Sequence, residues 1–486
     1  MTSATVDKNE SVQGLLRAVD QAVSVTPGGK VRVQDEAKLR EKVRTLAEKS
    51  AFGSDAEQAA ARWLVWESAA ALGIVAASIQ GLYAARGRGE TPVNFTVPAM
   101  NLRAMTFDSA CAVFRAAQAL DAGAFIFEIA RSEMAYTHQR PTEYVTSVLA
   151  AAIKEGHRGP VFIQGDHFQI NLKKYKVNPE AEVAAVKELA VEAVGAGFYN
   201  IDVDSSTLVD LDLETIPEQQ RENAARCAEL TAFIRGLEPK GVTISIGGEI
   251  GEVGSRNSTE VELRAFMDSY NAALLEQTVN GRRSRGIVGL SKISIQTGTS
   301  HGGVVLPDGT MAEVAVDFDV LKRLSQVARK EYSMSGAVQH GASTLPEAAF
   351  SKFAESEACE VHLATNFMNM LFTMMPATLK DECYAWLRTN QAGERKATDT
   401  DEQFYYKTRK QAVGPFKQQV WTLPDDQRQA IGAAWEKQFK FLFTQLNITN
   451  TYQLVRKTVE PVAIHKTLAD YGLAEKEAED VSGLSD

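Results

Sequence analysis

Short apolar runs alternate with segments of helical periodicity along the middle of the chain. Eight runs have the length of buried strands: Thr96 to Met100, Ala124 to Ile129, Val161 to Gly165, Phe198 to Val203, Val242 to Gly247, Lys292 to Gln296, Gly336 to Gln339 and Glu360 to Leu363. Seven segments between them have a helical pattern: Phe107 to Ala122, Thr142 to Gly156, Pro179 to Gly195, Pro217 to Gly236, Thr259 to Gln277, Phe318 to Glu331 and Leu345 to Glu357. This alternation predicts a (β/α)8 (TIM) barrel. An open doubly wound sheet is the alternative, but no GxGxxG motif follows the first strand.

The segments on either side of this region have helical patterns. Residues 1–92 carry Leu39, Val43 and Leu46 at helical spacing, followed by an alanine-rich stretch that closes at Gly87 and Gly89. Residues 371–486 are helical in pattern and rich in aromatic side chains. The sequence therefore predicts a helical N-terminal extension (1–92), a barrel (93–370) and a helical C-terminal extension (371–486) that packs against the barrel or a partner subunit.

Composition excludes several classes of function. The net charge of -10 argues against binding of nucleic acid, which depends on clustered lysine and arginine. The chain has no membrane-length apolar run and no signal-peptide pattern at its start, so we expect a cytoplasmic protein that does not bind a membrane. The four cysteines are scattered without a CxxC pair, which favours buried thiols over disulfides or a sulfur-bound metal.

The clearest candidate for chemistry is the sequence Gly165-Asp166-His167 at the end of the third predicted strand. Neighbouring residues on an extended strand point in opposite directions, so only a bend lets Asp166 and His167 reach one cavity. His301 and His340 also follow short apolar stretches, and each precedes a glycine. Three neutral imidazoles with one open position are what a catalytic zinc ion needs.

Polar residues follow most of the other predicted strands as well. In a barrel of this kind the active site lies at the carboxyl ends of the strands. Each such residue alone is more often a solvated loop residue, but together they indicate one site: Asn101, Arg103, Glu128, Arg131, Asp166, His167, Asp202, Asp204, Ser205, Ser206, Glu249, His301 and His340.

Four motifs resemble, in order and spacing, those of class II, zinc-dependent fructose-bisphosphate and tagatose-bisphosphate aldolases. They are Gly165-Asp166-His167-Phe168, Gly248-Glu249-Ile250-Gly251-Glu252-Val253-Gly254, Gly298-Thr299-Ser300-His301-Gly302 and His340-Gly341-Ala342-Ser343. Two further motifs of that family have counterparts in Pro98-Ala99-Met100-Asn101 and Val203-Asp204-Ser205-Ser206. The resemblance covers roughly residues 93–370 and implies a zinc-dependent aldolase.

The resemblance also implies roles for individual residues. Five would hold Zn²⁺ or another divalent metal ion, as ligands or as secondary carboxylates: His167, His301, His340, Glu249 and Asp204. Four would contact the phosphate of a small phosphorylated sugar: Gly302, Gly341, Ser343 and Asn366. Cleavage of a ketose phosphate leaves charge on an enediolate that a metal ion stabilises as a Lewis acid. Asp166 would be the catalytic acid/base. We also expect a homo-oligomer.

Two departures from the family keep other functions open. Where the family has loop acids, this chain has Gly254-Ser255-Arg256-Asn257-Ser258. The eighth strand continues as His362-Leu363-Ala364-Thr365-Asn366, without the family's Asn and its Thr-Asp or Thr-Glu pair. These changes favour, as one alternative, a metal-dependent epimerase or isomerase for a sugar or sugar acid. The other alternative is a non-catalytic companion subunit, against which the intact histidines argue.

Overall fold

Eight parallel strands form a closed ring in the computed structural model, which describes residues 3–251, 256–279, 281–283, 286–298, 316–343, 345–471 and 481–484. Each barrel strand pairs with the next one along the chain, and the last pairs with the first. The strands are β4 (Val97–Asn101), β5 (Ile126–Ala130), β6 (Gly159–Gln169), β7 (Asn200–Asp204), β8 (Ser245–Glu249), β11 (Lys292–Ser294), β12 (Ala337–Gln339) and β13 (Glu360–Leu363). The predicted (β/α)8 barrel and its eight strands are confirmed.

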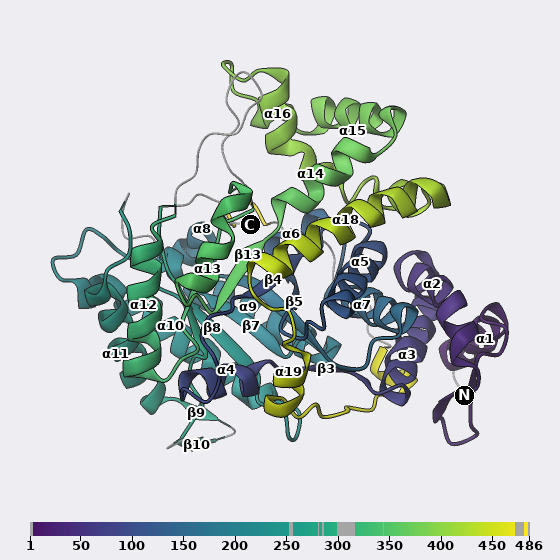
Figure 1. Cartoon of the computed structure of the whole chain (residues 1–486), viewed down its shortest axis with the longest axis horizontal. Coiled ribbons are helices and arrows are strands. Elements are labelled where there is room, and N and C mark those ends of the chain that lie inside the picture. The colour runs from purple at the N-terminus through teal and green to yellow at the C-terminus, as the bar shows by residue number, and fades with distance from the viewer. Residues whose placement is uncertain are drawn as a thin grey trace.

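Helices surround this barrel, with α10, α11 and α12 on one side and α5 and α7 on the other (Figure 1). The helices that connect or follow the strands are α5 (Thr106–Ala119), α6 (Arg131–Tyr136), α7 (Pro141–Glu155), α8 (Leu172–Val177), α9 (Pro179–Ala196), α10 (Ile216–Leu237), α11 (Glu260–Glu276), α12 (Phe318–Tyr332), α13 (Ser351–Glu355) and α14 (Thr365–Met374). A two-stranded ribbon, β9 (Thr278–Val279) and β10 (Arg282–Arg283), follows α11.

Local sequence signals set the ends of these helices, and α9 illustrates them. The side chain of Asn178 accepts a hydrogen bond from the Ala181 backbone N–H at 3.2 Å, and Pro179 occupies the first turn. Gly197 ends the helix with a φ of 119°, a left-handed conformation that glycine adopts without strain. The apolar stripe between these ends is buried against the barrel.

Before the barrel the chain contains strands as well as helices. The elements are α1 (Ser3–Ala18), β1 (Val23–Val25), β2 (Val31–Val33), α2 (Glu36–Phe52), α3 (Asp55–Ala71), β3 (Ile74–Ala77) and α4 (Gln80–Gly87). Strand β3 pairs in parallel with the first half of β6, from Gly159 to Phe162, whereas β7 pairs with β6 only from Gln164 onward. A ninth strand thus lies beside β6 at the amino end of the barrel. The expected domain boundaries at residues 92 and 370 stay a prediction.

After the barrel come α15 (Ala377–Asn390), α16 (Asp401–Thr408), α17 (Lys417–Trp421), α18 (Asp425–Gln445) and α19 (Tyr452–Thr458). The indole N–H of Trp435, in α18, donates to the backbone oxygen of Phe367 at 3.1 Å. Beyond α19 the chain runs along α3, where Trp66 donates to the backbone oxygen of Ile464 at 2.7 Å. The two ends of the chain therefore pack on the barrel and on each other. Among the described residues, no helix is long and apolar enough to cross a membrane.

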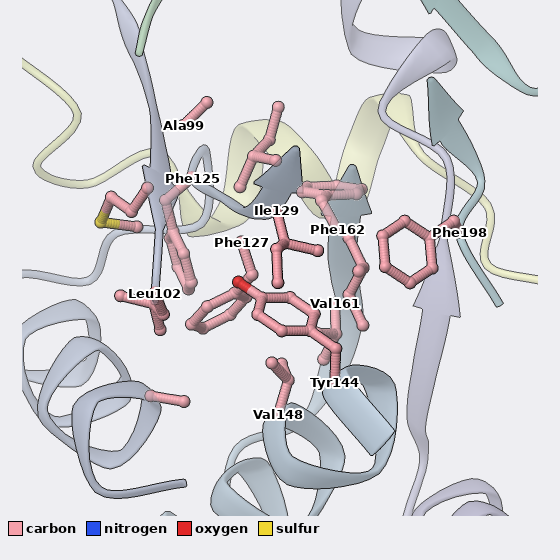
Figure 2. Packing of buried hydrophobic residues seen from close by; sticks show 14 of the residues in the cluster. Ala99, Leu102, Phe125, Phe127, Ile129, Tyr144, Val148, Val161, Phe162 and Phe198 are labelled. Carbon is pink, nitrogen blue, oxygen red and sulfur yellow. The ribbon is translucent and has the colours of Figure 1, made fainter. Parts of the chain in front are cut away.

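The packing between the barrel and α7 orients the strands. Phe127 of β5 and Val161 of β6 lie beside Tyr144 and Val148 of α7 (Figure 2). The Tyr144 hydroxyl donates to the backbone oxygen of Glu128 at 2.6 Å. Because adjacent side chains on a strand alternate in direction, the outward packing of Phe127 turns Glu128 toward the barrel axis. Apolar packing on the outside of the barrel thus directs the alternate, polar side chains of the strand to the inside of the barrel.

Candidate active site

Several of the predicted site residues meet at the carboxyl ends of the barrel strands. Possible ligand atoms of Asp166, His167 and His340 all lie within 4.8 Å of one another. His167 forms a second such group with Asp204 and Glu249. These residues belong to β6, β7 and β8 or directly follow β12. His301 and Gly302 lie outside the described residues.

A bend in β6 brings Asp166 and His167 to the same cavity. His167 has a φ of 40°, in the left-handed region, and the pairing of β6 with β7 shifts register between Gly165 and Phe168. A Cβ atom on Gly165 would lie 2.3 Å from the ring of Phe168, so only glycine fits there. The β-bulge is the bend that the sequence requires for both side chains to act together.

Carboxylates hold the His167 ring in place. Its Nδ1 donates to Asp204 Oδ2 at 3.0 Å and lies 3.5 Å from Glu249 Oε2. Its Nε2 is 3.8 Å from Asp166 Oδ1, and its ring centre is 4.4 Å from that of His340. Burial would lower the pKa of His167, but the three carboxylates raise it well above its ordinary value. Burial, with the charge of Asp204, raises the pKa of Glu249 to about 8. The surroundings of His167 thus attract positive charge.

Asp166 is fixed from two sides. Its Oδ2 accepts a hydrogen bond from Asn101 Nδ2 at 2.9 Å, and its Oδ1 lies 3.1 Å from Nδ1 of His362. Burial would raise the pKa of Asp166, but the charges of His167 and His362 hold it well below its ordinary value. The carboxylate is therefore ionised at neutral pH and can accept a proton.

A buried polar network continues below Asp166 into the barrel. Nε2 of His362 is 2.7 Å from Glu360 Oε1, and Glu360 also binds Nζ of Lys292. Lys292 donates further to Gln164 Oε1 at 2.8 Å and to Asp202 Oδ2 at 3.0 Å. Of these residues, only Asp202 was expected from the sequence to belong to the site. Polar residues two apart in β13, at 360 and 362, share the inner face of the strand, and that spacing is the signal that could have revealed them.

A cavity of about 30 Å³ opens above this network, enough for an ion or a water molecule. Its lining includes residues of β4, β6 and β13 and of the segments that follow β4, β12 and β13: Asn101, Arg103, Asp166, His167, His340, Gly341, Ser343, His362, Ala364 and Thr365. Gly341 and Ser343 thus line the cavity, and their contacts with a phosphate stay a prediction. Asn366 is the next residue in α14 and is not among the lining residues. Its role stays a prediction.

A family model described as fructose-bisphosphate aldolase class-II matches residues 91–422. The chain belongs to this family. It is thus a class II aldolase, a carbon–carbon lyase. The match extends beyond the barrel into the C-terminal helices as far as α17.

Solved structures with a similar fold were also found. A protein of Sinorhizobium meliloti 1021, described as a probable tagatose 6 phosphate kinase, is 17% identical over 78% of this chain and 97% of its own, with a TM-score of 0.50. The fructose-bisphosphate aldolase of Campylobacter jejuni is 15% identical over 78% of this chain and 96% of its own, with a TM-score of 0.45. At 17% identity the first likeness bears on the fold alone. No curated protein matches the sequence.

Class II aldolases generally depend on a divalent metal ion, and the side chains of this aldolase suit one. Two imidazoles and a carboxylate converge within 4.8 Å, which is a donor set for a borderline cation such as zinc. Asp204 lies behind His167, as carboxylates commonly do behind metal-bound histidines. Ser294 Oγ, 2.9 Å from His340 Nε2, holds the other ring.

Proposed function

We propose that this aldolase reversibly cleaves a phosphorylated ketose, that it requires one divalent metal ion, zinc by preference, and that Asp166 transfers the proton. The observation that carries the proposal is the convergence of Asp166 with His167 and His340 in one cavity. When bound, the ion would act as a Lewis acid on the ketone of the substrate. His167 and His340 would hold it, together with His301, which lies outside the described residues.

The protein's own groups then account for the proton transfer. Retro-aldol cleavage removes a proton from a hydroxyl group while the neighbouring carbon–carbon bond breaks and an aldehyde forms. Asp166 is ionised and accepts this proton, and it later returns the proton to carbon in the ketone fragment. Asn101 keeps the carboxylate oriented through its 2.9 Å hydrogen bond to Oδ2.

The phosphate contacts are proposed on the same wall of the cavity. Gly341 has a φ of 71° and no side chain, so its backbone can approach a ligand closely. Ser343 already accepts a hydrogen bond from the Ala364 N–H at 2.7 Å, and its hydroxyl hydrogen is available for an anion. Arg103 also lines the cavity, where its guanidinium pairs with the buried Glu133. A cytoplasmic location and a homo-oligomer complete the proposal.

Two substitutions test the separate roles of metal ligand and acid/base. Asp166→Asn should keep the ion that the histidines hold and slow ketose phosphate cleavage about a hundredfold or more. His340→Ala should lose both the ion and the activity. His157→Gln is the matched control, because His157 is a buried histidine far from the lining of the cavity. If Asp166→Asn loses the ion while His340→Ala retains it, the assignment of roles is wrong.

A further inference from the structure

A second set of possible ligands lies directly beneath the candidate active site. Nδ1 of His362 is 3.1 Å from Asp166 Oδ1 and 3.2 Å from Glu128 Oε1. One ligand atom from each of the three residues lies within 4.8 Å of the others, and all three side chains are buried. A single imidazole nitrogen carries at most one proton, so it cannot fully satisfy two carboxylates.

The orientation of His362 matches that of a metal-bound histidine. Its Nε2 lies 2.7 Å from Glu360 Oε1, a distance at which Nε2–H donates to the carboxylate. When the ring carries a single proton, on Nε2, the lone pair of Nδ1 faces Glu128 and Asp166. A histidine that binds a cation through one ring nitrogen typically donates the N–H of its other nitrogen to a carboxylate, and the further ligands of the cation lie near the free nitrogen. His167 has the same arrangement, with Asp204 behind it.

Glu128 provides a second observation in favour of a cation at this place. Its side chain is fully buried, and among the described residues Oε1 accepts no hydrogen bond, although Oε2 accepts one from Gln164 at 2.8 Å. A buried carboxylate oxygen without a donor is strongly unfavourable. Lys292 does not fill this place, because its hydrogen bonds go to Gln164, Asp202 and Glu360.

The charges of the network point the same way. Four buried carboxylates belong to it: Glu128, Asp166, Asp202 and Glu360. The cations that face them are Lys292 and, when they are protonated, His362 and His167. At least one negative charge would thus remain without a counter-charge inside the barrel, where uncompensated charge is costly.

We infer that Glu128, His362 and Asp166 form a second divalent cation site, so that the aldolase binds two ions with Asp166 between them. One nitrogen and two carboxylate ligands suit Mn²⁺, Co²⁺ or Zn²⁺. The inference adds an ion to the one that the proposed function requires, and it does not depend on the reaction catalysed. The rival explanation is a proton on Glu128 instead of an ion.

Metal stoichiometry decides between an ion and a proton. The full-length protein is stripped with a chelator, dialysed against Mn²⁺ or Zn²⁺, and analysed for bound metal per chain. We expect two ions for the wild type, one for Glu128→Gln and for His362→Gln, and two for the control His157→Gln. One ion in the wild type, or an unchanged count in Glu128→Gln, would overturn the inference.

Electron paramagnetic resonance of the Mn²⁺-loaded wild type gives a second readout that needs no variant to fold. Two ions that share Asp166 should give an exchange-coupled signal, whereas isolated ions give separate mononuclear spectra. Mononuclear spectra alone would contradict the shared site. If the protein binds two ions but has no aldolase activity, the proposed function is refuted and this inference stands. If the protein is active with one ion, the proposed function stands and this inference is refuted.

Discussion

Replacement of Lys292 by methionine should severely destabilise the barrel. The side chain is 1% exposed, and the three hydrogens of its ammonium group reach Gln164, Asp202 and Glu360, of which the last two are charged. Although burial would lower the pKa of Lys292, the two carboxylates raise it above its ordinary value, so the lysine is charged at neutral pH. Methionine matches the side chain up to Cε but lacks the ammonium group, so it leaves both carboxylates without this cation.

Removal of one partner from a buried ion pair typically destabilises a protein by about 3–5 kcal/mol, because the other charge stays buried. We therefore expect the Lys292→Met variant to lose about that much free energy of unfolding. Guanidinium titration, followed by circular dichroism, measures the loss as a lower midpoint with an unchanged slope. The double variant Lys292→Met with Glu360→Gln should recover part of the stability, since it removes a carboxylate that lost its partner.

The matched control is Lys187→Met. Lys187 pairs with Glu229 at 2.5 Å, but both side chains are about one quarter exposed. Water screens such a pair, so its loss should change stability by less than about 1 kcal/mol. If Lys292→Met cost no more than Lys187→Met, or if the double variant were less stable than the single one, the buried network would not support the barrel as described.

Two further predictions concern stability. Gly87→Ala should destabilise the protein, because the new Cβ would lie 2.1 Å from the Ser333 backbone oxygen. In Gly195→Ala, in α9, the new Cβ meets nothing within 4 Å, so this variant should be more stable by about 1 kcal/mol. Thermal unfolding compares the two variants. Burial lowers the pKa of His157 to about 4, so the unfolded state takes up its proton first as pH falls below about 6.5. Stability should fall by about 3 kcal/mol between pH 6.5 and 4, and His157→Gln should flatten that slope.

The barrel could be predicted because its signal is local. Each strand is a short apolar run that ends at polar or glycine residues, and the alternation of strands with helices indicates the topology. Strand β3 is missing from the prediction because Ile74-Val75-Ala76-Ala77 lies inside an alanine-rich stretch with a helical pattern. Its pairing with the first half of β6 depends on a register that local sequence does not encode.

The candidate site likewise contains residues that the sequence could predict and residues that it could not. Asp166, His167 and His340 follow apolar runs, and the structure brings them together. Lys292 and His362 lie within strands, where a polar residue in a short run is easily taken for one on the solvent side. Their partners come from β6, β7 and β13, so closure of the barrel, rather than any motif, creates the network.

Proton exchange at the substrate carbon tests the central claim most directly. The zinc-loaded protein is mixed with dihydroxyacetone phosphate in heavy water, without an aldehyde, and the loss of carbon-bound hydrogen is followed by nuclear magnetic resonance. A metal-dependent aldolase with Asp166 as acid/base should exchange one of the two hydrogens stereospecifically, lose the reaction on chelation, and lose it in Asp166→Asn. Absence of exchange with metal bound, or exchange into an unphosphorylated sugar acid alone, would contradict the account.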